Sequence, residues 1–90
     1  MAEKENRELP EVSFSMFILS LNTSALVHLG QLPDPLTQEK KVDLALARHT
    51  IDTLQMLREK TKGNLTKEEE KLLDSILYEL RILYLKKAGA

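Results

Sequence analysis

The sequence predicts an all-α fold of three helices, and three observations support this prediction. Apolar residues recur at spacings of three and four along most of the chain, which is the periodicity of an α-helix. Aromatic residues make up only 4% of the chain and Trp is absent, so a core must be built mainly from aliphatic side chains, which suit helix packing. Residues that favour helix starts and stops also border each periodic stretch.

The composition is that of one small folded domain. Hydrophobic residues make up 42% and charged residues 30% of the 90 residues, an ordinary balance for a folded chain. We expect a mobile, charged leader over residues 1–12, ending shortly after Pro10, and a single helical domain over residues 13–87.

The first helix is expected over residues 13–29, with Ser13 as its N-cap and Gly30 as its stop. Leu21 stands at the centre of its main apolar stripe and should therefore be a core residue. The stripe as a whole is formed by Phe14, Phe17, Ile18, Leu21, Ala25 and Leu29.

The connection from Gly30 to Val42 is long for a link between two helices, where two to eight residues are typical. Its Pro33-Asp34-Pro35 segment prevents the helix from resuming and favours a rigid turn or extended element. The connection is either an ordered crossover packed onto the domain or a functional loop.

The second helix is expected over residues 44–62, after the N-cap Asp43 and before the stop at Gly63. The third is expected over residues 67–86, where Thr66 and Glu69 form a capping box. Since so few residues separate these helices, they must form a tight antiparallel hairpin.

Two of the helices carry apolar residues on both sides, which predicts neighbours that a three-helix monomer does not supply. Leaving these side chains in water would forfeit several kcal/mol, at about 25 cal/mol per Å² of apolar surface. We therefore expect a homo-oligomer, with a dimer favoured, whose fold is completed by packing between copies. Its association surface is expected to include Met16, Leu19, Ser20, Ser24, Leu26 and Val27 of the first helix, with Tyr78, Ile82 and Leu85 of the third.

Two histidines invite a chemical interpretation. His28 ends a row with Ser20 and Ser24, but no third residue orients the imidazole and no oxyanion site is evident. His49 and Asp52 have a spacing compatible with metal ligation, yet no second segment completes a coordination sphere. Packing and surface roles are favoured for both, and we expect no catalytic residue, metal or cofactor.

Charge and polarity argue against two further classes of function. The formal net charge is −1 with a pI near 6.1, and no basic face provides the phosphate contacts of a nucleic-acid-binding protein. The uncharged stretch from Val12 to Pro33 contains too many Ser, Thr and Asn residues for a membrane span. The absence of Cys fits a cytoplasmic location.

Several stretches resemble a known family. The segment beginning at Phe14 contains "LSLNTSALVHLGQLPDP", and the later part contains "ARHTIDTLQMLREKTKGNLTKEEEKLLDSILYELR". Together, from about Ser13 to Tyr84, they resemble a bacterial family of short proteins described as domain of unknown function 1844. The resemblance implies a bacterial, cytoplasmic helical protein and brings no functional residues with it.

The leading hypothesis is a homo-oligomeric binding or scaffolding module without catalytic activity. The alternative is a small metal-binding protein or enzyme that uses His28 or His49. Metal analysis of the purified protein distinguishes the two, because only the alternative predicts stoichiometric zinc or iron.

Overall fold

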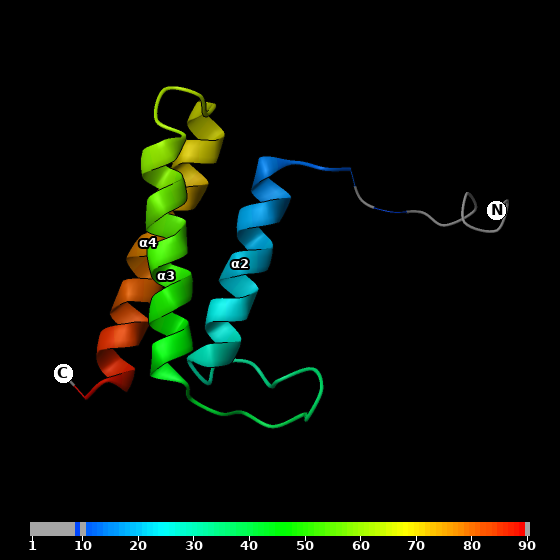
Figure 1. The fold of residues 1–90 in the computed structure, drawn as a ribbon, viewed down its shortest axis with the longest axis vertical. Helices are drawn as coiled ribbons and strands as arrows, with labels where there is room; N and C mark the ends of the chain where they lie inside the picture. The colour runs from blue at the N-terminus through cyan, green and yellow to red at the C-terminus, as the bar shows by residue number, and fades with distance from the viewer. Residues whose placement is uncertain (1–8, 10, 90) are drawn as a thin grey trace, which may run out of the picture.

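The computed structural model describes Leu9 and residues 11–89, and these residues contain three α-helices (Figure 1). The helices are α2 (Phe14–His28), α3 (Leu44–Lys60) and α4 (Lys67–Lys87). The predicted helices, 13–29, 44–62 and 67–86, agree with these bounds to within two residues at each end. The all-α prediction is confirmed. Most of the predicted leader, residues 1–12, lies outside the described residues.

Each helix begins at a side chain that satisfies a backbone amide of its first turn. Ser13 and Asp43 each accept a hydrogen bond of 3.0 Å from the amide three residues later. Thr66 Oγ1 accepts one of 3.1 Å from the Glu69 amide, and the Glu69 carboxylate accepts one of 2.9 Å from the Thr66 amide. The predicted N-caps and the capping box are therefore confirmed, and amides that would otherwise lack partners are paired.

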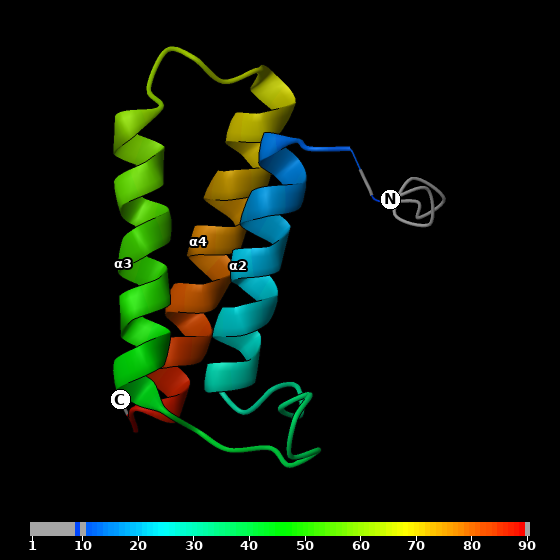
Figure 2. The same cartoon turned by 45° about the vertical axis from the view of Figure 1, so that its right-hand side comes forward.

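The helices α3 and α4 form the antiparallel hairpin that the sequence predicts, and α2 packs against both (Figure 2). The chain leaves α3 through Gly63, whose φ of +86° lies in the left-handed region that favours glycine. This tight turn places the start of α4 beside the end of α3.

The connection between α2 and α3 is an ordered crossover. Leu29 and Val42 form an isolated antiparallel bridge, and the Asp43 amide donates a 2.7 Å hydrogen bond to the His28 carbonyl. Within the loop, the Asp34 carboxylate accepts a 2.7 Å hydrogen bond from the Leu36 amide. The crossover thus joins the end of α2 to the start of α3 and fixes their antiparallel arrangement.

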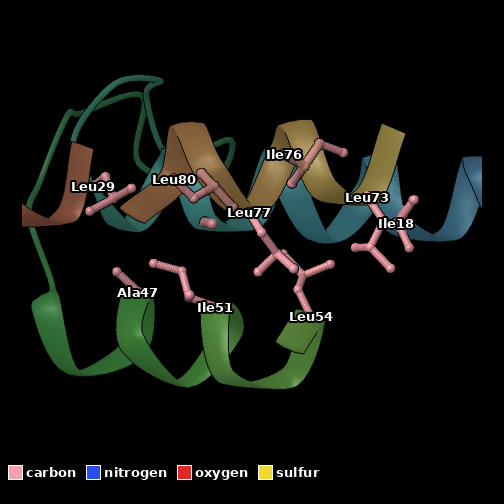
Figure 3. Close-up of a cluster of buried hydrophobic side chains, with 10 residues drawn as sticks. Ile18, Leu29, Ala47, Ile51, Leu54, Leu73, Ile76, Leu77 and Leu80 are labelled. Atoms are coloured by element: carbon pink, nitrogen blue, oxygen red, sulfur yellow. The ribbon is translucent and has the colours of Figure 1, made fainter. Parts of the chain in front are cut away.

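The hydrophobic core lies between the three helices (Figure 3). Its largest fully buried side chains come from α2, the bridge residue after it, α3 and α4, so no pair of helices could form it alone. Its members are Ile18, Ala25, Leu29, Ala47, Ile51, Leu54, Leu73, Ile76, Leu77 and Leu80.

The side of α2 that faces the core is centred on Ile18 and Ala25. The apolar stripe predicted to face the core is therefore wrong in part. Phe17 is 49% exposed, and Leu21 is only partly buried at the margin of the core. Successive helical residues are separated by about 100°, which places Phe17 well to one side of the buried Ile18. Because α2 is apolar on several sides, its sequence does not indicate which arc faces the hairpin.

Candidate association surfaces

The outward side of α2 is exposed and carries no Asp, Glu, Lys or Arg. We define the outer face of α2 as its six exposed residues, which are Met16, Phe17, Leu19, Ser20, Thr23 and Ser24. The three apolar side chains in this set are between 39% and 49% exposed. A surface helix usually presents charged residues to water, so an uncharged face of this kind is typical of an interaction site.

Two hydroxyl groups on the outer face are already hydrogen bonded within the helix. Ser20 Oγ donates to the Phe17 carbonyl at 2.7 Å, and Thr23 Oγ1 donates to the Leu19 carbonyl at 3.1 Å. Burying a polar group is costly mainly when its hydrogen bond is lost. These two hydroxyls would keep their bonds under another helix, so burying them costs little, whereas Ser24 Oγ forms no hydrogen bond among the described residues.

The structure divides the α2 residues of the predicted association surface into two groups. Met16, Leu19, Ser20 and Ser24 are exposed and belong to the outer face. Leu26 is partly buried and packs against the core, and Val27, also partly buried, lies beside the crossover. Leu26 therefore contributes to the fold of the domain itself.

Ser24, His28 and Asp34 lie around one shallow hollow of about 280 Å³ between α2 and the crossover. Among the described residues, no hydrogen bond joins any two of these three side chains, and the Asp34 carboxylate instead organises the crossover turn. The Ser20 hydroxyl is occupied by a backbone carbonyl of its own helix. The row therefore lacks the nucleophile–base hydrogen bond of an activated serine.

His49 and Asp52 are both exposed on α3. The Asp52 carboxylate forms an ion pair with Arg48 at 3.3 Å, in which both side chains are more than 60% exposed. Within residues 11–89, no group of three or more His, Asp or Glu side chains is placed to hold a metal ion.

A groove follows the seam between α3 and α4, and its lining contains no residue of α2. It consists of two adjoining hollows that share Gln55, Arg81 and Leu85. The three exposed residues that the sequence singled out on α4, Tyr78, Ile82 and Leu85, form part of its α4 wall. The sequence did not indicate the α3 residues that line the groove, because these polar residues have the pattern of a solvated helix face.

The α3–α4 groove contains three arginines with different partners. Arg58 Nε lies 2.7 Å from the Asp74 carboxylate, and this hydrogen bond raises the pKa of Arg58. The neighbouring Tyr84 side chain, together with the Asp52 carboxylate, raises the pKa of Arg48. Arg81 donates to the neutral amide oxygen of Gln55 and forms no ion pair within residues 11–89.

No helix in the described part of the chain combines the length and apolar character needed to cross a bilayer.

A comparison with curated proteins found no match, and a comparison with solved structures found none. A family model, "Domain of unknown function (DUF1844)", matches residues 11–86. The match includes all of α2 and α3 and nearly all of α4, together with the crossover. The chain therefore belongs to the DUF1844 family.

Proposed function

We propose that this protein is a non-catalytic, homo-oligomeric binding or scaffolding module, and that two copies pair through the outer face of α2. The observation that supports this proposal is the absence of charge on that exposed face, combined with the internal hydrogen bonds of Ser20 and Thr23. Hydration stabilises such a surface only weakly, and a second helix can cover it without breaking the hydrogen bonds of Ser20 and Thr23.

A second copy is the partner that this face fits best. In a two-fold pair the same patch contacts itself, so a charge close to the two-fold axis would lie beside the same charge of the other copy. The outer face of α2 has no charged side chain to be repelled. Ser20 and Ser24 are small and lie one turn apart, which lets two helix backbones approach closely.

Burial would supply the driving force. Complete burial of a large apolar side chain is worth about 1.5–3 kcal/mol relative to full exposure. Met16, Phe17 and Leu19 are each between 39% and 49% exposed, so each would contribute part of that amount. Two copies provide such side chains twice over, which gives a dimer a favourable term of several kcal/mol before the cost of association.

The proposal is tested by placing the same charge at two methionines of similar exposure. Met16 on the outer face of α2 is 49% exposed, and Met56 on α3 is 44% exposed. Met16→Lys should shift the protein to monomer in sedimentation equilibrium, because two copies would each bring a charge into the apolar contact. Met56→Lys is the matched control and should leave the mass unchanged.

Three results would contradict the proposal. These are a wild-type protein that is monomeric, a Met16→Lys variant with an unchanged oligomer, and an equal loss of oligomer in both variants. The non-catalytic part is tested separately by metal analysis, since stoichiometric zinc or iron would support a role for His28 or His49 instead.

A further inference from the structure

We propose that the α3–α4 groove binds an amphipathic helix of a different protein, and that this helix presents a carboxylate to Arg81. The groove lies on the hairpin and shares no residue with the outer face of α2, so this inference is independent of the self-association proposed above.

Arg81 is the cation that a partner would neutralise. The other two arginines of the groove already face carboxylates, Arg48 with Asp52 and Arg58 with Asp74. Arg81 has only the neutral Gln55 amide, which holds its guanidinium where the two hollows meet. A guanidinium presents several donors in a planar fork, so one hydrogen bond to Gln55 leaves donors for an incoming carboxylate.

The apolar part of the groove has the spacing and length of a helix-binding site. Tyr78, Ile82 and Leu85 are four and three residues apart, so they form a ridge along α4, and they are 67%, 37% and 55% exposed. From Asp74 to Leu85 the groove follows α4 for about 16 Å, at 1.5 Å of rise per residue. A helix laid along this ridge would use residues at similar spacings on its own apolar side.

The position of Arg81 disfavours a second copy as the occupant. Because Arg81 lies where the two hollows join, a two-fold pairing of grooves would bring Arg81 of each copy close to the other. Two unpaired guanidinium groups in an apolar contact repel each other and lose hydration. A helix with Asp or Glu at its centre replaces this repulsion by attraction, and its carboxylate accepts hydrogen bonds that offset the hydration Arg81 loses.

The test uses two synthetic peptides of about 18 residues, long enough to span the groove. Both carry Leu at helical spacings of three and four on one side and neutral Ala and Gln elsewhere. They differ only at the centre, which is Glu in one peptide and Gln in the other. Binding to the full chain is followed by amide chemical shifts and by the Arg81 side-chain Nε–H resonance.

We expect shifts at Tyr78, Ile82 and Leu85 with both peptides, and a change at Arg81 Nε–H that is larger with the Glu peptide. The Glu peptide should bind about two- to five-fold more tightly, the range for a partly exposed ion pair. Arg81→Gln should reduce this preference to about one-fold. Lys67→Gln, the same loss of charge at the start of α4, should retain it.

Several outcomes would overturn this inference. They are equal affinity for the two peptides, a Glu preference that survives in Arg81→Gln, shifts confined to α2, and an absence of shifts at millimolar peptide. A loss of oligomer mass on Arg81→Gln would assign the groove to a second copy. Binding of dodecanoate at the same residues without binding of either peptide would assign it to a small amphiphile.

Discussion

Arg81 on α4 donates a hydrogen bond to the side-chain amide of Gln55 on α3, a residue 26 positions earlier in the chain. The bond crosses the seam of the hairpin at the centre of the groove. It links the two helices. Arg81 forms no ion pair with a carboxylate among the described residues.

The first prediction tests this link in the hairpin. Gln55→Ala and Arg81→Ala should each destabilise the protein, and the double variant should lose less than the sum of the two. The shared bond should appear as a coupling free energy of about 0.5–1.5 kcal/mol in a double-mutant cycle. Urea denaturation of the four proteins measures it, and additive losses would mean that the bond contributes nothing to stability.

The capping box at the start of α4 gives a second prediction. Thr66→Ala should lower the free energy of unfolding by about 1 kcal/mol, because it leaves the Glu69 amide without its side-chain acceptor. Glu69→Ala should cost less, and the two losses should be non-additive since each side chain binds the other residue's amide. Full additivity in denaturant melts would show that the two hydrogen bonds act independently.

A third prediction concerns the crossover and uses two glycines as a matched pair. Gly30 and Gly63 have φ values of +76° and +86°, so replacement by Ala strains the backbone at both, by about 1–2 kcal/mol. A Cβ on Gly30 would also lie 2.9 Å from Val42 Cγ2, whereas one on Gly63 would meet nothing within 4 Å. Gly30→Ala should therefore be the more destabilising substitution in thermal melts. Equal losses of stability would mean that the crossover moves away from the new Cβ on Gly30 at no cost in free energy.

Much of the fold was predictable because its determinants are local. The caps at Ser13, Asp43 and Thr66 act within one helical turn, and the positive φ at Gly63 follows from a single residue. Phe17 was misplaced because a helix that is apolar on several sides does not reveal its buried arc.

The candidate surfaces were predictable only in part. The exposed apolar residues of α4 were evident from their spacing, but the α3 wall of the groove was not. The pairing of Arg81 with Gln55, or of Arg58 with Asp74, depends on the register of the hairpin. Polar residues on one helix do not specify that register.

The fourth prediction separates the core of α2 from its outer face. Ile18 is fully buried, so Ile18→Ala should cost about 2–5 kcal/mol through the cavity it leaves. Leu19 is exposed, and Leu19→Lys should shift the protein from dimer to a monomer that stays folded. Leu26→Lys should unfold the domain, since Leu26 packs against the core. Sedimentation and circular dichroism on the same samples test this division, and it would be wrong if Leu19→Lys also abolished the helical signal.

The mass of the wild-type protein in solution is the most direct test of the proposed self-association. Sedimentation equilibrium across the micromolar range should give twice the 10.3 kDa mass of the chain, and Met16→Lys should return the single-chain value with the helical signal intact. A wild-type mass of 10.3 kDa at every concentration would contradict the account, because the uncharged outer face of α2 would then remain in water without a second copy.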